Sequence, residues 1–257
     1  MAVIIGIVLP LLAAGAQAAE LKVYASTAVK AVLQELGPQF EKATGDNLVF
    51  TFGLTSAVKK QIDEGAAFDV AILTLTLIND LATAGKIDPA SRIAIARVGS
   101  GVSVPAGSSK PDVSTAEALK RTLLQAKSIG FNGVGASRAG NEALLAKLGI
   151  ADQVKLKIKL LNESAPVGVA KGEVEIGLGS MSEVLLVPGV QLAGPFPTGL
   201  QSYLVFMGVS SVSKSADAAR SLIKFLTAPA AVSSKTKTWS RDDQGHNHER
   251  RETAAMI

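Results

Sequence analysis

Extended apolar segments alternate with amphipathic helical segments through most of this 257-residue chain. The segments that predict strands are 21–25, 48–53, 69–73, 92–107, 128–131, 154–161, 174–180 and 203–210. Those that predict helices are 28–45, 57–65, 75–86, 115–126, 138–149, 181–187 and 217–229. A repeated strand–helix order is typical of α/β proteins, in which helices cover mostly parallel sheets. We therefore expect an α/β fold.

Local patterns refine three of these segments. Gly37 and Pro38 lie inside the first helical segment, where proline removes a backbone hydrogen bond, so this helix should kink or split. Ser114 precedes the fourth helical segment and Glu117 follows three residues later, which is the spacing of a capping box. Charged and apolar residues alternate in segment 154–161, as they do on a half-exposed strand. The lysines expected on its exposed face are Lys155, Lys157 and Lys159.

Small polar residues follow four of the predicted strands, where a helix begins. They are Ser26, Thr27, Thr55, Ser56, Ser137 and Ser180. In open α/β sheets ligands bind outside the carboxyl ends of the strands, where helix N-termini present free N–H groups and a positive dipole end. Ser and Thr are also common N-caps that need no ligand. Four junctions in matching positions favour an anion site made of hydroxyls and backbone amides.

Missing residue types exclude most catalytic and metal chemistry. Cysteine is absent, and the two histidines, His246 and His248, lie near the C-terminus. A disulfide framework, a zinc ribbon, a Ser-His-Asp triad and a His-rich metal site in the body are therefore excluded. The carboxylate pairs are not spaced to converge on one ion, so we expect no metal and no cofactor. Aromatic residues make up only 4% and none interleave with the lysines, so no nucleic-acid partner is expected.

The two ends of the chain differ from its body. Residues 2–16 are uncharged and mostly apolar, and Ala16 and Ala18 form the small-x-small pattern of a cleavage site. Residues 1–19 are therefore predicted to be a signal peptide that directs export to the periplasm; the alternative is an ordinary buried segment. Residues 235–257 are polar and have no hydrophobic period, so we expect a disordered tail.

Four ordered segments carry a resemblance to a known family: 21–45, 49–74, 188–210 and 217–231. They contain a strand–Ser–helix junction, a Phe-Gly-hydroxyl run before a GAxxDV segment, and a closing helix that ends in TxPxA. In this order they resemble the substrate-binding proteins of ABC importers, specifically the molybdate-binding branch with the type 2 periplasmic-binding fold. The resemblance covers residues 20–233.

The resemblance implies two lobes, each a mostly parallel sheet flanked by helices, joined by a hinge of two crossing strands. Lobe 1 would comprise residues 20–101 and 200–234, and lobe 2 residues 102–199. Hinge closure would clamp a small anion, either a molybdate- or tungstate-like oxyanion or a small organic acid. The protein would be a monomer that delivers this ligand to an ABC transporter permease in the membrane.

The resemblance also assigns residues to the anion site. Ser26 corresponds to the first serine of lobe 1 and Thr55 to the second hydroxyl, while Ser137 falls in the equivalent turn of lobe 2. Leu54 stands where relatives usually have a serine, and Ser180 stands where molybdate binders commonly have tyrosine. These two departures leave room for a sub-branch whose ligand is a carboxylate.

Arg138 directly follows Ser137 at the start of a predicted helix. The helix dipole disfavours a cation there unless an anion compensates it. Arginine can grip a carboxylate through two parallel hydrogen bonds, so a functional Arg138 would favour an organic acid over a bare oxyanion. The alternative is a solvated surface arginine.

An enzyme on the same scaffold is the second hypothesis. A few relatives of this fold are isomerases that shift the double bond of an unsaturated tricarboxylic acid such as aconitate. Such a proton transfer needs a positioned acid and base. Without histidine in the body the candidates are Glu, Asp, Lys and Tyr, and none is clearly placed in the four junctions. We therefore expect a binding protein first, an isomerase second, and an exported binding domain without a transporter third.

Overall fold

The computed structural model describes residues 18–228, so most of the predicted signal peptide and the whole predicted tail lie outside the described residues. The strands within this range are β1 (Glu20–Ser26), β2 (Asn47–Gly53), β3 (Val70–Thr74), β4 (Ile93–Pro105), β5 (Ile129–Asn132), β6 (Ile158–Leu161), β7 (Ile176–Ser180), β8 (Val190–Pro195) and β9 (Tyr203–Ser210). The α-helices are α1 (Lys30–Thr44), α2 (Thr55–Asp63), α3 (Leu75–Thr83), α4 (Ala116–Gln125), α5 (Arg138–Lys147), α6 (Ala151–Val154), α7 (Ala165–Ala170), α8 (Met181–Val184) and α9 (Ala216–Thr227). Short 3₁₀ turns are η1 (Thr27–Val29), η2 (Pro89–Ser91), η3 (Lys155–Lys157) and η4 (Thr198–Leu200).

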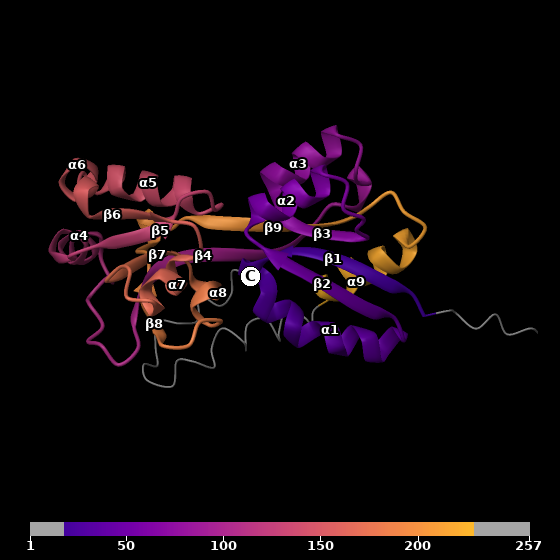
Figure 1. Cartoon of the computed structure of the whole chain (residues 1–257), viewed down its shortest axis with the longest axis horizontal. Coiled ribbons are helices and arrows are strands. Elements are labelled where there is room, and N and C mark those ends of the chain that lie inside the picture. The colour runs from indigo at the N-terminus through magenta and orange to yellow at the C-terminus, as the bar shows by residue number, and fades with distance from the viewer. Residues whose placement is uncertain (1–17, 229–257) are drawn as a thin grey trace, which may run out of the picture.

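The strands follow the spatial order β2-β1-β3-β9-β4-β7-β5-β6, and β8 pairs with β4. β1 is parallel to β2 and β3, and β5 is parallel to β6 and β7. The antiparallel strands β4 and β9 lie between these two parallel groups. The result is two lobes, each with a parallel core, as the sequence predicts (Figure 1).

Helices cover both faces of each lobe (Figure 1). In lobe 1, α2 and α3 lie on one side of the strands and α1 and α9 on the other; in lobe 2, α5 lies opposite α7 and α8. Buried side chains form separate cores accordingly. The core beneath α1 and α9 contains Phe40 and Phe206, whereas the core beneath α4 and α5 contains Phe131. Each lobe is thus held by its own apolar packing.

Strand β4 connects the lobes by changing partners along its length. Its first half, Ile93–Gly99, pairs with β9, and its second half, from Ser100, pairs with β7 and β8. The side chain of Gln201 bridges this point, because Oε1 accepts from Ser100 N at 2.8 Å and Nε2 donates to Ser100 O at 3.0 Å. The lobe boundaries predicted from the sequence stay predictions, since β4 runs through one boundary and η4 through the other.

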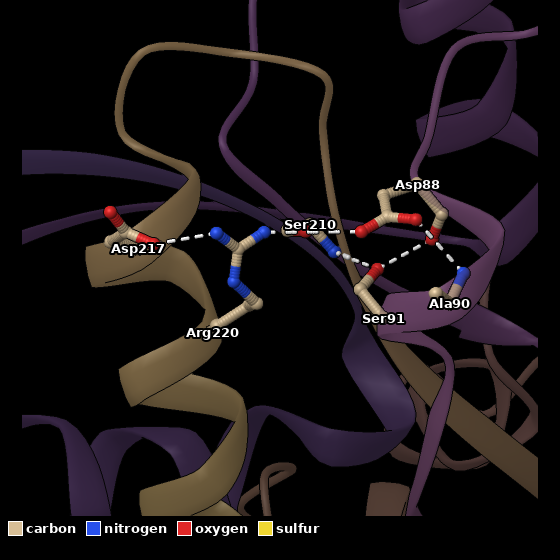
Figure 2. Close-up of polar contacts among 6 residues, drawn as sticks. All are labelled: Asp88, Ala90, Ser91, Ser210, Asp217 and Arg220. Carbon is tan, nitrogen blue, oxygen red and sulfur yellow. Dashed lines mark hydrogen bonds and ion pairs between the residues drawn. The ribbon is translucent and has the colours of Figure 1, made fainter.

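A polar cluster anchors η2 to the outer end of β9 (Figure 2). Ser91 Oγ donates to Asp88 O at 2.7 Å and accepts from Ser210 N at 2.9 Å. Arg220 of α9 joins the cluster, with Nη2 2.5 Å from Asp217 Oδ1 and Nη1 3.9 Å from Asp88 Oδ2. Because this cluster lies at the outer end of lobe 1, we assign it a structural role.

The structure corrects two predictions about helices. Helix α1 runs unbroken through Pro38, so the predicted split is absent, while a kink there stays a prediction. Pro38 is exposed, so water can satisfy the carbonyl that proline leaves unpaired. Gly37 instead lets α1 approach β2 closely, since a Cβ there would lie 3.1 Å from the ring of Phe50. Helix α4 is capped by Thr115, which accepts from Ala118 N at 3.1 Å, whereas Ser114 hydrogen-bonds to a preceding aspartate.

The strand predicted over 154–161 was wrong in its first half. Residues 151–157 form α6 and η3, and only Ile158–Leu161 is a strand. Leu156 is 99% exposed, so the alternation did not mark a buried face. Lys157 and Lys159 point back to backbone carbonyls of other elements instead of sharing one exposed strand face. Helix α7 and strand β8 were not predicted, because they are short and carry no clear hydrophobic period.

Within residues 18–228 we find no helix that is both long enough and apolar enough to cross a membrane.

Candidate functional site

The four strand–helix junctions singled out in the sequence meet at one small cavity of about 20 Å³. Lobe 1 contributes Ser26 at the end of β1 and Thr55 at the start of α2, and lobe 2 contributes Ser137 before α5 and Ser180 at the end of β7. The carboxyl ends of parallel strands meet at the same sheet edge, which explains why these residues converge. The candidate site therefore lies between the lobes.

The hydroxyls of lobe 1 are neighbours because β1 and β2 run in register. Ser26 pairs with Gly53, two residues before Thr55, and the two hydroxyl oxygens are 3.4 Å apart. Ser26 Oγ also accepts from Ala28 N at 3.3 Å, which caps η1. One of the two hydroxyl protons is used in this contact, so the other hydroxyl can still direct its proton at a ligand.

The turn before α5 is shaped by the side chain of Asn132, which the sequence analysis did not select. Its Oδ1 accepts from Val134 N and its Nδ2 donates to Glu163 O, both at 2.8 Å. A Cβ at Gly135 would lie 2.8 Å from Asn132 Oδ1, so only glycine fits there without a shift. Gly135, Ala136 and Ser137 line the cavity, and their N–H groups have no partner among the described residues. They are available to an anion.

Three predicted site residues do not line the cavity. Thr27 is the first residue of η1. Ser56 Oγ donates to Val134 O at 3.3 Å and so connects α2 of lobe 1 with the turn of lobe 2. Arg138 is held by its own lobe, with Nε 2.8 Å from Glu142 Oε1 and Nη1 2.5 Å from Gly133 O. A role in ligand binding for these three stays a prediction.

Glu183 on α8 is the feature of the cavity that sequence reasoning missed. It is the one ionisable side chain among the lining residues. Its residue is only 9% exposed, and its carboxyl makes no hydrogen bond or ion pair with any described residue. Burial alone raises its pKa to about 7. The available signal was the Ser180-x-x-Glu183 spacing, which places an acid one turn after a predicted binding residue.

The remaining wall of the cavity is apolar. It is formed by Ala28, Leu54, Ala165, Leu178, Leu204 and Phe206, with Gly179 beneath the carboxyl of Glu183. In the part of the chain that the structure describes, no three acidic or histidine side chains are grouped to hold a metal ion. The cavity thus combines neutral donors with one carboxyl in an otherwise apolar environment.

Comparisons with known proteins agree with this arrangement. Residues 21–238 match the family described as bacterial extracellular solute-binding protein. The molybdate-binding protein ModA of Azotobacter vinelandii is 33% identical over 180 residues, which is 68% of this chain and 69% of that protein. An aconitate isomerase of a Pseudomonas species is 28% identical over 231 residues, 87% of each protein.

The fold comparison gives the same result. The solved structure of the periplasmic molybdate-binding protein of Azotobacter vinelandii superposes with a TM-score of 0.70 at 22% identity, covering 83% of this chain and 95% of that one. The predicted two-lobed periplasmic-binding fold is thereby confirmed. Because the family match spans most of the sequence, the chain belongs to the bacterial extracellular solute-binding proteins and is similar to their molybdate-binding members.

Proposed function

We propose that this protein captures a small anion between its two lobes and delivers it, as a periplasmic monomer, to the permease of an ABC importer. One observation carries the proposal: hydroxyls from four strand–helix junctions, two in each lobe, line one cavity. Family membership supports the transport role. The predicted signal peptide supports export.

Neutral donors can hold an anion here without a cation. The N-termini of α2 and α5 each add the positive end of a helix dipole, and the free N–H groups of the turn before α5 add further donors. Apolar neighbours exclude water, which strengthens each of these interactions. A water molecule alone needs roughly 10–15 Å³, so the cavity of about 20 Å³ is small and the lobes would have to part slightly to admit even a compact anion.

A larger organic acid would require the lobes to separate. The Ser56–Val134 hydrogen bond and the packing of η1 on α8 are the contacts between lobes that would change. Hinge motion about two crossing strands is the established way for such folds to open. Ligand size therefore does not by itself separate an oxyanion from a tricarboxylate.

The first test is thermal unfolding of the exported domain with molybdate, tungstate, sulfate, phosphate, citrate and both aconitates. A ligand of the native state at 100 times its Kd should add about 2.7 kcal/mol. Ser26→Ala should weaken that anion's Kd roughly 10- to 100-fold, because a hydrogen bond to a charged group contributes about 1.5–3 kcal/mol.

Ser108→Ala is the matched control, since Ser108 is exposed in a loop of lobe 2 and its hydroxyl donates to Pro105 O, away from the cavity. It should leave the Kd unchanged. An absence of any thermal shift across the panel would refute anion capture. An unchanged Kd in Ser26→Ala would refute the role of that hydroxyl.

An isomerase acting on an unsaturated tricarboxylic acid is the second candidate. Glu183 is the specific observation that favours it, because a carboxyl with a pKa near neutrality suits general acid–base chemistry. The aconitate isomerase of Pseudomonas, which aligns over 87% of this chain, supports it as well.

The double-bond shift needs one carboxyl to remove and return a proton, and it needs no cofactor. Ionised Glu183 would take a proton from the methylene carbon, and the C–H electron pair would form the new double bond. The electrons of the old double bond would then bind the returned proton at the other carbon. Hydroxyls and N–H groups around the cavity would stabilise the negative charge that spreads onto the substrate carboxylates.

The test is to incubate the protein with cis-aconitate in D2O and follow the products by NMR. An isomerase should form trans-aconitate with deuterium in the methylene and vinyl positions. Glu183→Gln should abolish both changes and still gain thermal stability from aconitate. If the wild type binds aconitate but shows neither exchange nor interconversion, the protein is not an isomerase.

A further inference from the structure

We propose that Glu183 and the captured anion share one proton. Glu183 therefore selects anions that either accept a hydrogen bond from the protonated carboxyl or bring a proton of their own. The inference rests on the proposed anion capture and goes beyond it. It makes Glu183 a specificity-determining residue and makes proton uptake part of ligand binding. It applies to an anion that is captured without being converted.

The geometry leaves the carboxyl without any other partner. Side-chain donors in the lining come from Ser26, Thr55, Ser137 and Ser180, while both ends of the Asn132 amide are already used. A captured anion would therefore meet these hydroxyls and the carboxyl of Glu183 together. If Glu183 stayed ionised, two negative charges would lie side by side in an environment of low dielectric constant and repel each other. A shared proton converts this repulsion into a hydrogen bond.

No charged side chain on the adjacent elements faces Glu183. The elements packed against α8 are β4, β7, β8 and η1. Among their residues only Arg97 of β4 is charged, and its guanidinium lies 3.8 Å from the centre of the Tyr203 ring. Glu183 is likewise the one charged residue of α8 itself. The shift in its pKa has burial as its sole cause, in agreement with this arrangement.

Closure of the lobes contributes to the burial of the Glu183 carboxyl. η1 belongs to lobe 1 and packs on α8 of lobe 2, and Ala28 of η1 lines the cavity together with Glu183. Opening the lobes would expose the carboxyl to water and lower its pKa towards the ordinary value. Protonation of Glu183 and closure around an anion therefore favour each other.

The test is calorimetric titration of the protein with molybdate, sulfate and phosphate at pH 6.0 and 8.5, in two buffers of different ionisation enthalpy. At pH 8.5 molybdate or sulfate should take up about one proton per bound ion, and at pH 6.0 almost none. For ligand-free protein in the closed form, in which the pKa of Glu183 is about 7, the apparent Kd of these ions should rise about 30-fold from pH 6.0 to 8.5, because only the protonated form is competent. Hydrogen phosphate carries its own proton and should bind at pH 8.5 without net uptake.

Glu183→Gln supplies a permanent neutral donor of the same shape. It should bind molybdate or sulfate with no proton uptake and with a Kd that differs less than about threefold between the two pH values. Glu173→Gln is the matched control, because Glu173 is exposed in the same lobe and should leave proton uptake intact. Glu183→Asp, which retains a titratable group, is the second variant if the glutamine protein does not fold.

The possible results of this titration distinguish failure of the shared proton from failure of anion capture. Binding of molybdate or sulfate to the wild type at pH 8.5 without proton uptake would overturn the shared proton and leave anion capture standing. A pH dependence that persists in Glu183→Gln would do the same. No binding heat with any of the three anions at either pH would count against anion capture itself, and the shared proton would fall with it.

Discussion

Glu183→Gln should stabilise the ligand-free protein by about 3 kcal/mol above pH 7 and change its stability little near pH 4.5. The folded-state pKa of about 7 lies above the ordinary value of 4.5, so the folded state binds this proton more tightly than the unfolded state. The free energy of unfolding therefore falls as the pH rises from about 4.5 to about 7. At 1.36 kcal/mol per pH unit this loss of stability totals about 3 kcal/mol. The Glu183→Gln protein does not lose this stability, because glutamine does not ionise.

Urea unfolding of both proteins at pH 5 and pH 8 measures the effect. The difference between them should be small at pH 5 and near its full value at pH 8. The exposed carboxyl of Glu173 gives the control, since Glu173→Gln should change stability equally at both pH values. A Glu183→Gln effect that does not vary with pH would mean that the carboxyl is solvated in the folded protein.

Phe206→Ala should destabilise the protein by about 3–5 kcal/mol. Phe206 is fully buried on β9, between β3 and β4, where it belongs to the core of lobe 1 and also forms part of the cavity wall. Removing the ring costs its transfer free energy and leaves a void. The same change should widen the anion cavity and weaken its closure, so the thermal shift by the preferred anion should shrink as well.

The neighbouring residue supplies the comparison. Val205 is 36% exposed, and Val205→Ala should cost less than about 1 kcal/mol. Urea unfolding midpoints of the two variants measure the contrast directly. Equal midpoints would show that lobe 1 relaxes around the missing ring, in conflict with the close packing described for its core.

The sequence predicted the long, strongly periodic elements well and the short ones poorly. Residues 203–210 are a strand with the predicted bounds, because a β-branched and aromatic run is bounded there by polar turns. The first half of segment 154–161 was assigned wrongly, because alternation in a short stretch also arises by chance in a helical turn. Helix α7 was missed because its six residues are too few to show a period.

In the candidate site, too, some residues could be predicted from the sequence and others could not. Ser26, Thr55, Ser137 and Ser180 could be selected from the sequence because each follows a strand, and parallel strand ends meet. Glu183 was not selected, because its spacing from Ser180 says nothing of its burial, to which η1 contributes from more than 150 residues away in the chain. From its position Arg138 could be an anion ligand or a surface arginine, and its role in binding stays a prediction. Its bond to Glu142 lies within α5, whereas its bond to Gly133 O depends on a turn that the sequence does not reveal.

The position of β9 between β3 and β4 has a consequence for the order of synthesis. Both neighbours are made long before it, since they end at residues 74 and 105, whereas β9 begins at residue 203. Until then β3 lacks a partner on one edge, and an open strand edge invites pairing with other chains. The first lobe to emerge is therefore the last to be completed, and such long-range pairing is slow. In a cell, this is the period in which the nascent chain is most open to pairing with other chains.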